Sequence, residues 1–131
     1  MSMLRFKKPN LSLEFDQLKG HNPALASIIE AADVFSDLEI DKHLMITHIF
    51  RTDHEQEQLY AHLPPQRRKK SHHQFWNAVD ISVKGMSEQE IEKLLKFFNN
   101  FTLNGGQLET AIYHKIPGNA FHFHVKYWMQ R

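Results

Sequence analysis

The sequence contains no cysteine among its 131 residues. Disulfide bonds and thiolate metal sites are therefore excluded, and any metal ion must be bound by His, Asp or Glu. The net charge is only +1 with histidine neutral, so overall charge gives no reason to expect nucleic-acid binding. A run of about eighteen apolar residues is also lacking, and we expect no membrane span.

A secretory signal peptide is lacking from the start of the sequence as well. Arg5, Lys7 and Lys8 supply basic charge there, but no apolar segment follows them. We expect synthesis in the cytoplasm without a secretion signal. If the substrate lies beyond the membrane, in the periplasm or outside the cell, another route must release or export the protein.

Histidine is the residue type in excess. The chain has ten, where ordinary usage would give roughly three. Most are expected to be scattered on the surface, but two close pairs stand apart: His72-His73 and His122-x-His124.

The length fits one domain, spanning 1–131, and the apolar fraction of 41%, with ten Phe, is sufficient for one core.

Turn signals and apolar periodicity predict a mixed fold. Residues 1–20 are expected to be an irregular arm, in which Leu11, Leu13 and Phe15 alternate as in a short strand. Helices are expected after N-cap signals at 23–37, 52–60 and 87–101. Strands are expected at 44–50, 77–83, 108–115 and 120–128. This order predicts a single α+β domain with a small, mainly antiparallel sheet and flanking helices.

The last strand carries His122 and His124 two positions apart. Residues two apart in a strand project from the same face, so both imidazoles should point together, while Phe123 and Val125 point to the other face. Burying two imidazoles without partners is costly. Their face is therefore either exposed to solvent or part of a site.

Asp80 lies between Val79 and Ile81 in an otherwise apolar strand. A carboxylate there needs a cation or several hydrogen-bond donors. It is either a structural Asp bonded to loop amides or a ligand. His73 precedes the strand, where a loop can fold back over Asp80. Two His and one carboxylate would leave a fourth tetrahedral position open, as in catalytic zinc sites.

These residues carry a family resemblance. Ser71-x-His73-x-x-x-x-Ala78-x-Asp80 resembles the Ser-x-His-x-x-Gly-x-Ala-x-Asp signature of the zinc D-alanyl-D-alanine peptidases. That family includes D-Ala-D-Ala carboxypeptidases, L-alanyl-D-glutamate endopeptidases and murein endopeptidases, and the hedgehog signalling domain shares its fold.

Two further motifs extend the resemblance over about residues 44–127. Residues 46–52 (ITHIFRT), followed by Gln56 and 59–60, are similar to the family's strand, Arg-Thr/Ser turn and helix. Residues 122–126 (HFHVK) resemble the His-x-His strand of the murein endopeptidases. His48 lies in the first of these motifs, and we expect a satisfied core or surface histidine there unless it lines the cleft.

The resemblance implies a site. His73, Asp80 and His124 match the zinc ligands, and His122 matches the histidine beside the metal. Arg51 matches the residue that stabilises the substrate carbonyl or carboxylate. Substrate-binding roles are also implied for Ser71 and Gln56. Zinc bound in this way lowers the pKa of a water ligand to about 7 and polarises a carbonyl.

The sequence departs from the family at two points. The signature Gly is Trp76, which puts the shape of the loop after His73 in doubt. Many members have a carboxylate three residues before the last zinc His, but here that residue is Phe121. Either His122 performs the acid–base step or the protein is a degenerate binder. In an alternative register, His122 rather than His124 is the ligand.

The resemblance predicts a zinc metallopeptidase, a monomeric hydrolase that cleaves an amide bond in peptidoglycan stem peptides or cross-links. It would act in cell wall degradation as a carboxypeptidase or an endopeptidase. Two alternatives stay open. One is a non-catalytic, zinc-containing binding module of the same fold. The other is a metal-dependent nucleic-acid-processing protein, suggested by the histidines and the basic loop 66–70, although we expect no nucleic-acid partner.

Overall fold

The structure, a computed structural model, describes residues 3–49, 76, 78–100, 111–115 and 121–127. For residues 111–115 and for Phe121 it describes the backbone alone. The helix predicted at 52–60, the basic loop 66–70 and the turn predicted at 117–119 lie outside the described residues.

The prediction of an irregular arm over residues 1–20 was wrong. Only β1 (Arg5–Phe6) is extended, and α1 (Pro9–His21) is a helix of 13 residues. The apolar residues Leu11, Phe15 and Leu18 are spaced four and three apart, so they share one helical face and are buried together. Leu13, the residue that suggested alternation, is 68% exposed on the opposite side.

The other two described helices confirm the sequence prediction. In α2 (Pro23–Glu39), Pro23 occupies the first turn and the side chain of Asn22 accepts a hydrogen bond from the backbone N–H of Leu25. In α4 (Glu88–Asn99), Ser87 and Glu90 form a reciprocal capping box. Both helices bury an apolar stripe, and α2 also buries the charged residue Asp33.

The predicted strands are also found, with shorter bounds. They are β2 (Met45–His48), β3 (Ala78–Ser82), β4 (Ala111–Lys115) and β5 (Phe121–Lys126). The sheet order is β1-β2-β3-β5-β4, and every pairing is antiparallel except β1 with β2. The prediction of a single α+β domain with a mainly antiparallel sheet is therefore confirmed.

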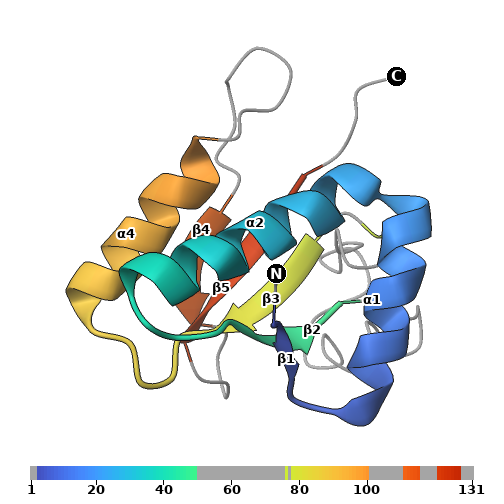
Figure 1. Cartoon of the computed structure of the whole chain (residues 1–131), viewed down its shortest axis with the longest axis horizontal. Coiled ribbons are helices and arrows are strands. Elements are labelled where there is room, and N and C mark those ends of the chain that lie inside the picture. The colour runs from blue at the N-terminus through green and yellow to red at the C-terminus, as the bar shows by residue number, and fades with distance from the viewer. Residues whose placement is uncertain (1–2, 50–75, 77, 101–110, 116–120, 128–131) are drawn as a thin grey trace, which may run out of the picture.

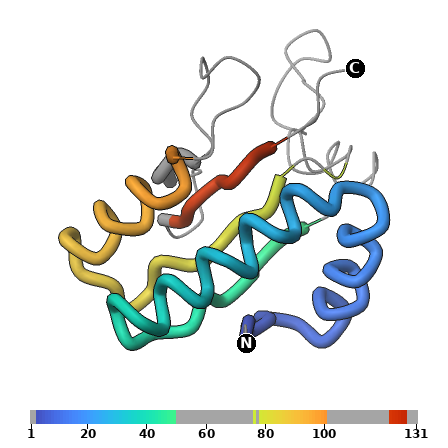
Figure 2. Tube along the Cα trace, turned by 45° about the horizontal axis from the view of Figure 1, so that its top comes forward, coloured from blue at the N-terminus to red at the C-terminus, as the bar shows by residue number. Residues whose placement is uncertain are grey.

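The described helices lie on one side of the sheet. Figure 1 shows α2 and α4 side by side across it, with α1 against its β1–β2 edge, and Figure 2 shows the same arrangement from a second direction. The core residues that the sheet contributes include Ile46, Val79, Ile81, Phe123 and Val125, all fully buried. The alternate residues of β3 and β5 project from the other face, which no described helix covers.

A buried carboxylate on α2 fixes the β1 edge of the sheet. Asp33 is fully buried, and its two oxygens accept the backbone N–H groups of Met3 and Leu44, each at 2.7 Å. His43 Nδ1 lies 3.5 Å from the same carboxylate. Asp33 thus holds the segments that enter β1 and β2, which run parallel and cannot be joined by a tight turn.

None of the described helices is both long and apolar enough to cross a lipid bilayer.

The α4 capping box is linked to the segment before β2 by an ion pair. Lys42 Nζ lies 2.6 Å from Glu90 Oε1, and the backbone N–H of Ser87 donates to the same oxygen at 2.8 Å. The hydrogen bond from Lys42, followed by that from Ser87, lowers the pKa of Glu90 below its usual 4.5.

We predict a pH-dependent stabilisation from this pair. Because the folded-state pKa of Glu90 is lowered, the contribution is complete above the unfolded-state pKa and is lost as the pH falls through the folded-state pKa. Glu90→Gln keeps the capping box but loses the charge. Its melting temperature should lie below that of the wild type at pH 7, and the difference should shrink as the pH falls below 4.5 and vanish once the pH is below the lowered folded-state pKa.

Glu92→Gln, which removes a charge from the same helix without touching the Lys42 pair, is the matched control. A difference in melting temperature between Glu90→Gln and the wild type that stays constant from pH 7 to pH 3 would contradict the prediction.

Candidate functional site

The two histidines of β5 lie as the alternation predicted. Phe123 and Val125 are fully buried in the core, whereas His122 and His124 project from the other face of the sheet toward the same residue, Asp80. The prediction of a shared face is confirmed. That face is not simply open to solvent, because His122 is only 8% exposed.

Asp80 is the centre of this cluster. It is paired with His124 across the β3–β5 ladder and is 5% exposed. Its Oδ1 lies 3.0 Å from His124 Nδ1, a hydrogen-bond distance, and its Oδ2 lies 3.7 Å from His122 Nε2. Each carboxylate oxygen thus faces a different imidazole. We call Asp80, His122 and His124 the sheet cluster.

A β-bulge in β2 directs two more side chains to the same face. Ile46 is paired with Ile81 and His48 with Asp80, so β2 advances two residues while β3 advances one. Ile46 and Ile49 are both fully buried although they are three positions apart, which regular alternation does not allow. The bulge therefore places Thr47 and His48 on the face of Asp80, where Thr47 Oγ1 donates to the Asp80 carbonyl at 3.3 Å.

The sheet cluster can be tested as part of a zinc site by its donor distances. Zinc bonds of about 2.0–2.2 Å at tetrahedral angles hold two donors about 3.3–3.6 Å apart. The separation of 3.0 Å between Asp80 and His124 is shorter than this range, and that of 3.7 Å between Asp80 and His122 is slightly longer, so both imidazoles lie near a ligand spacing from Asp80. Among the described residues, no three His, Asp or Glu side chains are arranged to hold a metal ion together.

The described part of the chain therefore brings Asp80 and two imidazoles together without completing a metal site. The predicted third ligand, His73, lies outside the described residues. So do Arg51, Gln56 and Ser71, to which the sequence assigned substrate contacts. The structure brings together Asp80, His122 and His124 from the predicted set and does not describe the other four.

Trp76, which stands where the family signature has Gly, has a backbone φ of +58°. This is the left-handed region, which glycine enters freely and which costs other residues about 1–2 kcal/mol. Its ring stacks on that of His21 at 4.7 Å with an interplanar angle of 9°. Trp76 thus takes a backbone conformation suited to glycine, and a ring contact holds it there.

Asn22 links this residue to the sheet. Its Nδ2 donates to the carbonyl of Trp76 at 3.1 Å and to that of Tyr127 at 2.7 Å. The sequence identified Asn22 only as a helix cap, and this second set of contacts was missed. No local signal could have revealed it, because the partners are 54 and 105 positions away.

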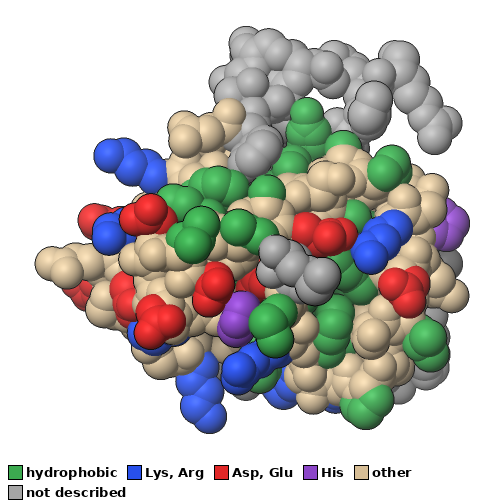
Figure 3. Space-filling model, viewed as in Figure 1, with side chains coloured by type: hydrophobic (Ala, Val, Ile, Leu, Met, Phe, Trp, Pro, Cys, Tyr) green, Lys and Arg blue, Asp and Glu red, His purple; other side chains and the backbone are tan. Residues whose placement is uncertain are grey.

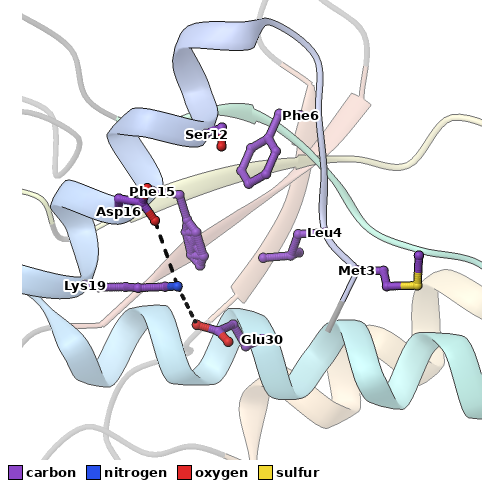
Figure 4. Close-up of a pocket in the computed structure, with 8 residues that line it drawn as sticks. All are labelled: Met3, Leu4, Phe6, Ser12, Phe15, Asp16, Lys19 and Glu30. Carbon is purple, nitrogen blue, oxygen red and sulfur yellow. Dashed lines mark ion pairs between the residues drawn. The ribbon is translucent and has the colours of Figure 1, made fainter. Parts of the chain in front are cut away.

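A hollow lined by described residues lies elsewhere, between the first described residues, α1 and α2. Figure 4 shows Leu4, Phe6 and Phe15 lining its interior, and Lys19 at the rim between Asp16 and Glu30. Its volume is about 230 Å³. None of its lining residues belongs to the sheet cluster, so we assign it no part in the site.

On the helical face, Figure 3 shows acidic and basic side chains interspersed, with hydrophobic side chains exposed between them. The described residues of this face therefore form no continuous basic surface of the kind on which nucleic-acid binding depends.

No family model, curated protein or solved structure matches this chain. The resemblance to the zinc peptidases accordingly rests on the residues quoted above.

We predict that the Thr47 hydroxyl stabilises the bulge. Thr47→Val keeps the shape of the side chain but removes the donor to the Asp80 carbonyl, which should cost about 0.5–1.5 kcal/mol in the free energy of unfolding. Thr47→Ser keeps the hydroxyl and serves as the control in urea denaturation. Full stability in Thr47→Val, together with a loss in Thr47→Ser, would assign the contribution of this side chain to its methyl group instead.

Proposed function

We propose that this protein is a zinc-dependent metallopeptidase that hydrolyses an amide bond in peptidoglycan stem peptides or cross-links. The observation that carries the proposal is the meeting of Asp80 and His124 at 3.0 Å on a face that no described helix covers. These residues are 44 positions apart and belong to two separate motifs of the resemblance.

The donor set is one that suits a metal ion. Asp80 is buried and faces an imidazole from each of its two oxygens. Neutral imidazoles and a carboxylate together form a zinc-binding set. Since the chain has no cysteine, such a set is also the one available to it.

Asp80 and His124 are proposed as two zinc ligands, and His73 as the third. When bound, zinc supplies an activated water molecule and polarises the scissile carbonyl. His122, whose Nε2 faces the second oxygen of Asp80 at 3.7 Å, is proposed to accept a proton and deliver it to the leaving amine. Arg51 is proposed to stabilise the oxyanion, and Ser71 and Gln56 to contact the substrate.

Zinc content tests the ligand assignment. Wild-type protein is expected to bind about one zinc per chain after dialysis, measured by plasma mass spectrometry. Asp80→Asn and His124→Ala should each weaken zinc binding by more than the roughly 10–100-fold that loss of an outer-shell partner causes. His43→Gln, at a histidine beside Asp33 and outside the sheet cluster, is the control and should retain zinc.

Equal zinc content in the wild type, Asp80→Asn and His124→Ala would overturn the ligand assignment. Loss of zinc in His122→Ala, but not in His124→Ala, would establish the alternative register.

Hydrolysis tests the activity. Zinc-loaded wild type should release fragments from purified peptidoglycan, detected by chromatography of the soluble products. His122→Ala should keep its zinc but lose roughly 10²–10⁴-fold in turnover, the usual contribution of a general acid–base group.

Zero turnover in both the wild type and His122→Ala, with equal zinc content, would favour the non-catalytic binding module. DNA cleavage or strongly salt-dependent DNA binding would favour the nucleic-acid alternative.

A further inference from the structure

The corner between α1 and α2 holds the two strands that carry Asp80 and His124. Asn22 forms this corner and is 6% exposed. Its side-chain oxygen caps α2 by accepting the N–H of Leu25 at 3.1 Å. The cap uses only the oxygen, so the amide nitrogen remains available for contacts outside the helix.

Both hydrogens of that nitrogen are directed to the sheet. They reach the carbonyls of Trp76 at 3.1 Å and of Tyr127 at 2.7 Å. Trp76 lies two residues before β3, and Tyr127 directly follows β5. The last pair of the β3–β5 ladder is Ala78 with Lys126, so the amide of Asn22 bridges the two chains just beyond it.

The bridge is close to the sheet cluster. The pair Asp80–His124 lies two ladder positions from Ala78–Lys126, about 7 Å along the strand. A change in the separation of the two strands at the Asn22 end would therefore be felt at the Asp80–His124 pair.

The same corner holds Trp76 by its ring. His21, the last residue of α1, stacks on Trp76 at 4.7 Å. Trp76 has a φ of +58°, which an unrestrained Trp rarely adopts. Two independent contacts from adjacent residues therefore fix a strained residue three positions after His73, and strain of this kind persists only where the surroundings determine it.

We propose that Asn22, with His21, is a positioning residue of the zinc site. It sets the spacing of the strands that carry Asp80 and His124. This inference rests on the proposed function. The competing explanation is that the corner contributes only to the stability of the fold, as a helix cap and a packing contact.

Two substitutions separate these explanations. Asn22→Asp keeps the capping oxygen but replaces the donor with a carboxylate oxygen facing two carbonyls. Asn22→Ser also keeps a cap but has no amide hydrogens. Ser87→Ala removes the cap of α4, which is not part of this corner, and is the control for loss of a cap alone.

The measurement is the zinc dissociation constant, obtained by competition with a chelator at a temperature where circular dichroism shows every variant folded. Asn22→Asp and Asn22→Ser should weaken zinc binding about tenfold or more, in the range of outer-shell changes. Ser87→Ala should bind within twofold of the wild type even though it melts earlier. If Asn22→Asp does not fold, Asn22→Ser decides the test.

Zinc binding within twofold of the wild type in a folded Asn22→Ser, accompanied by a lower melting temperature, would overturn the inference. A wild type that binds no zinc would overturn the proposed function instead. Amide hydrogen exchange then decides whether the amide of Asn22 holds β3 and β5 together. Faster exchange in Asn22→Ser confined to β3 and β5 would support it, and equal acceleration in α4 would refute it.

Discussion

A carboxylate in the middle of an apolar strand sets the main constraint on this molecule. Asp80 is flanked in sequence by Val79 and Ile81, both fully buried, yet it is itself only 5% exposed. A charge in that position must be balanced by neighbours of fixed geometry. The chain meets this requirement with two imidazoles from β5, one for each carboxylate oxygen, and the β2 bulge gives the same face an additional histidine, His48.

Much of the fold could be predicted because its signals are local. The caps at Asn22 and Ser87 and the alternation around Phe123 each lie within a few residues of the element that they specify. The same locality misled the prediction for residues 1–20, where Leu11, Leu13 and Phe15 fit alternation over five residues. Leu18, about one turn further along, fits the helical period with Leu11 and Phe15. That period can be recognised only in a window longer than five residues.

The candidate site was predictable only in part, for the same reason. The shared face of His122 and His124 follows from the strand period, and their meeting with Asp80 follows once β3 and β5 pair. The bulge at Thr47 and the double hydrogen bond from Asn22 have no local signal. They depend on strand register and on partners remote in sequence, which tertiary packing decides.

The bulge also divides β2 into two parts with opposite periodicity. Before the bulge, Ile46 pairs with β1 and β3 and its side chain is buried in the core. After the bulge, the next buried side chain is that of Ile49. Without the bulge, strict alternation of the same residues would send His48 into the hydrophobic interior and turn Ile49 toward the carboxylate. Deleting the extra residue would keep both isoleucines inward, so a one-residue deletion is better tolerated here than in a regular part of the strand, where it would exchange the polar and apolar sides for all that follows.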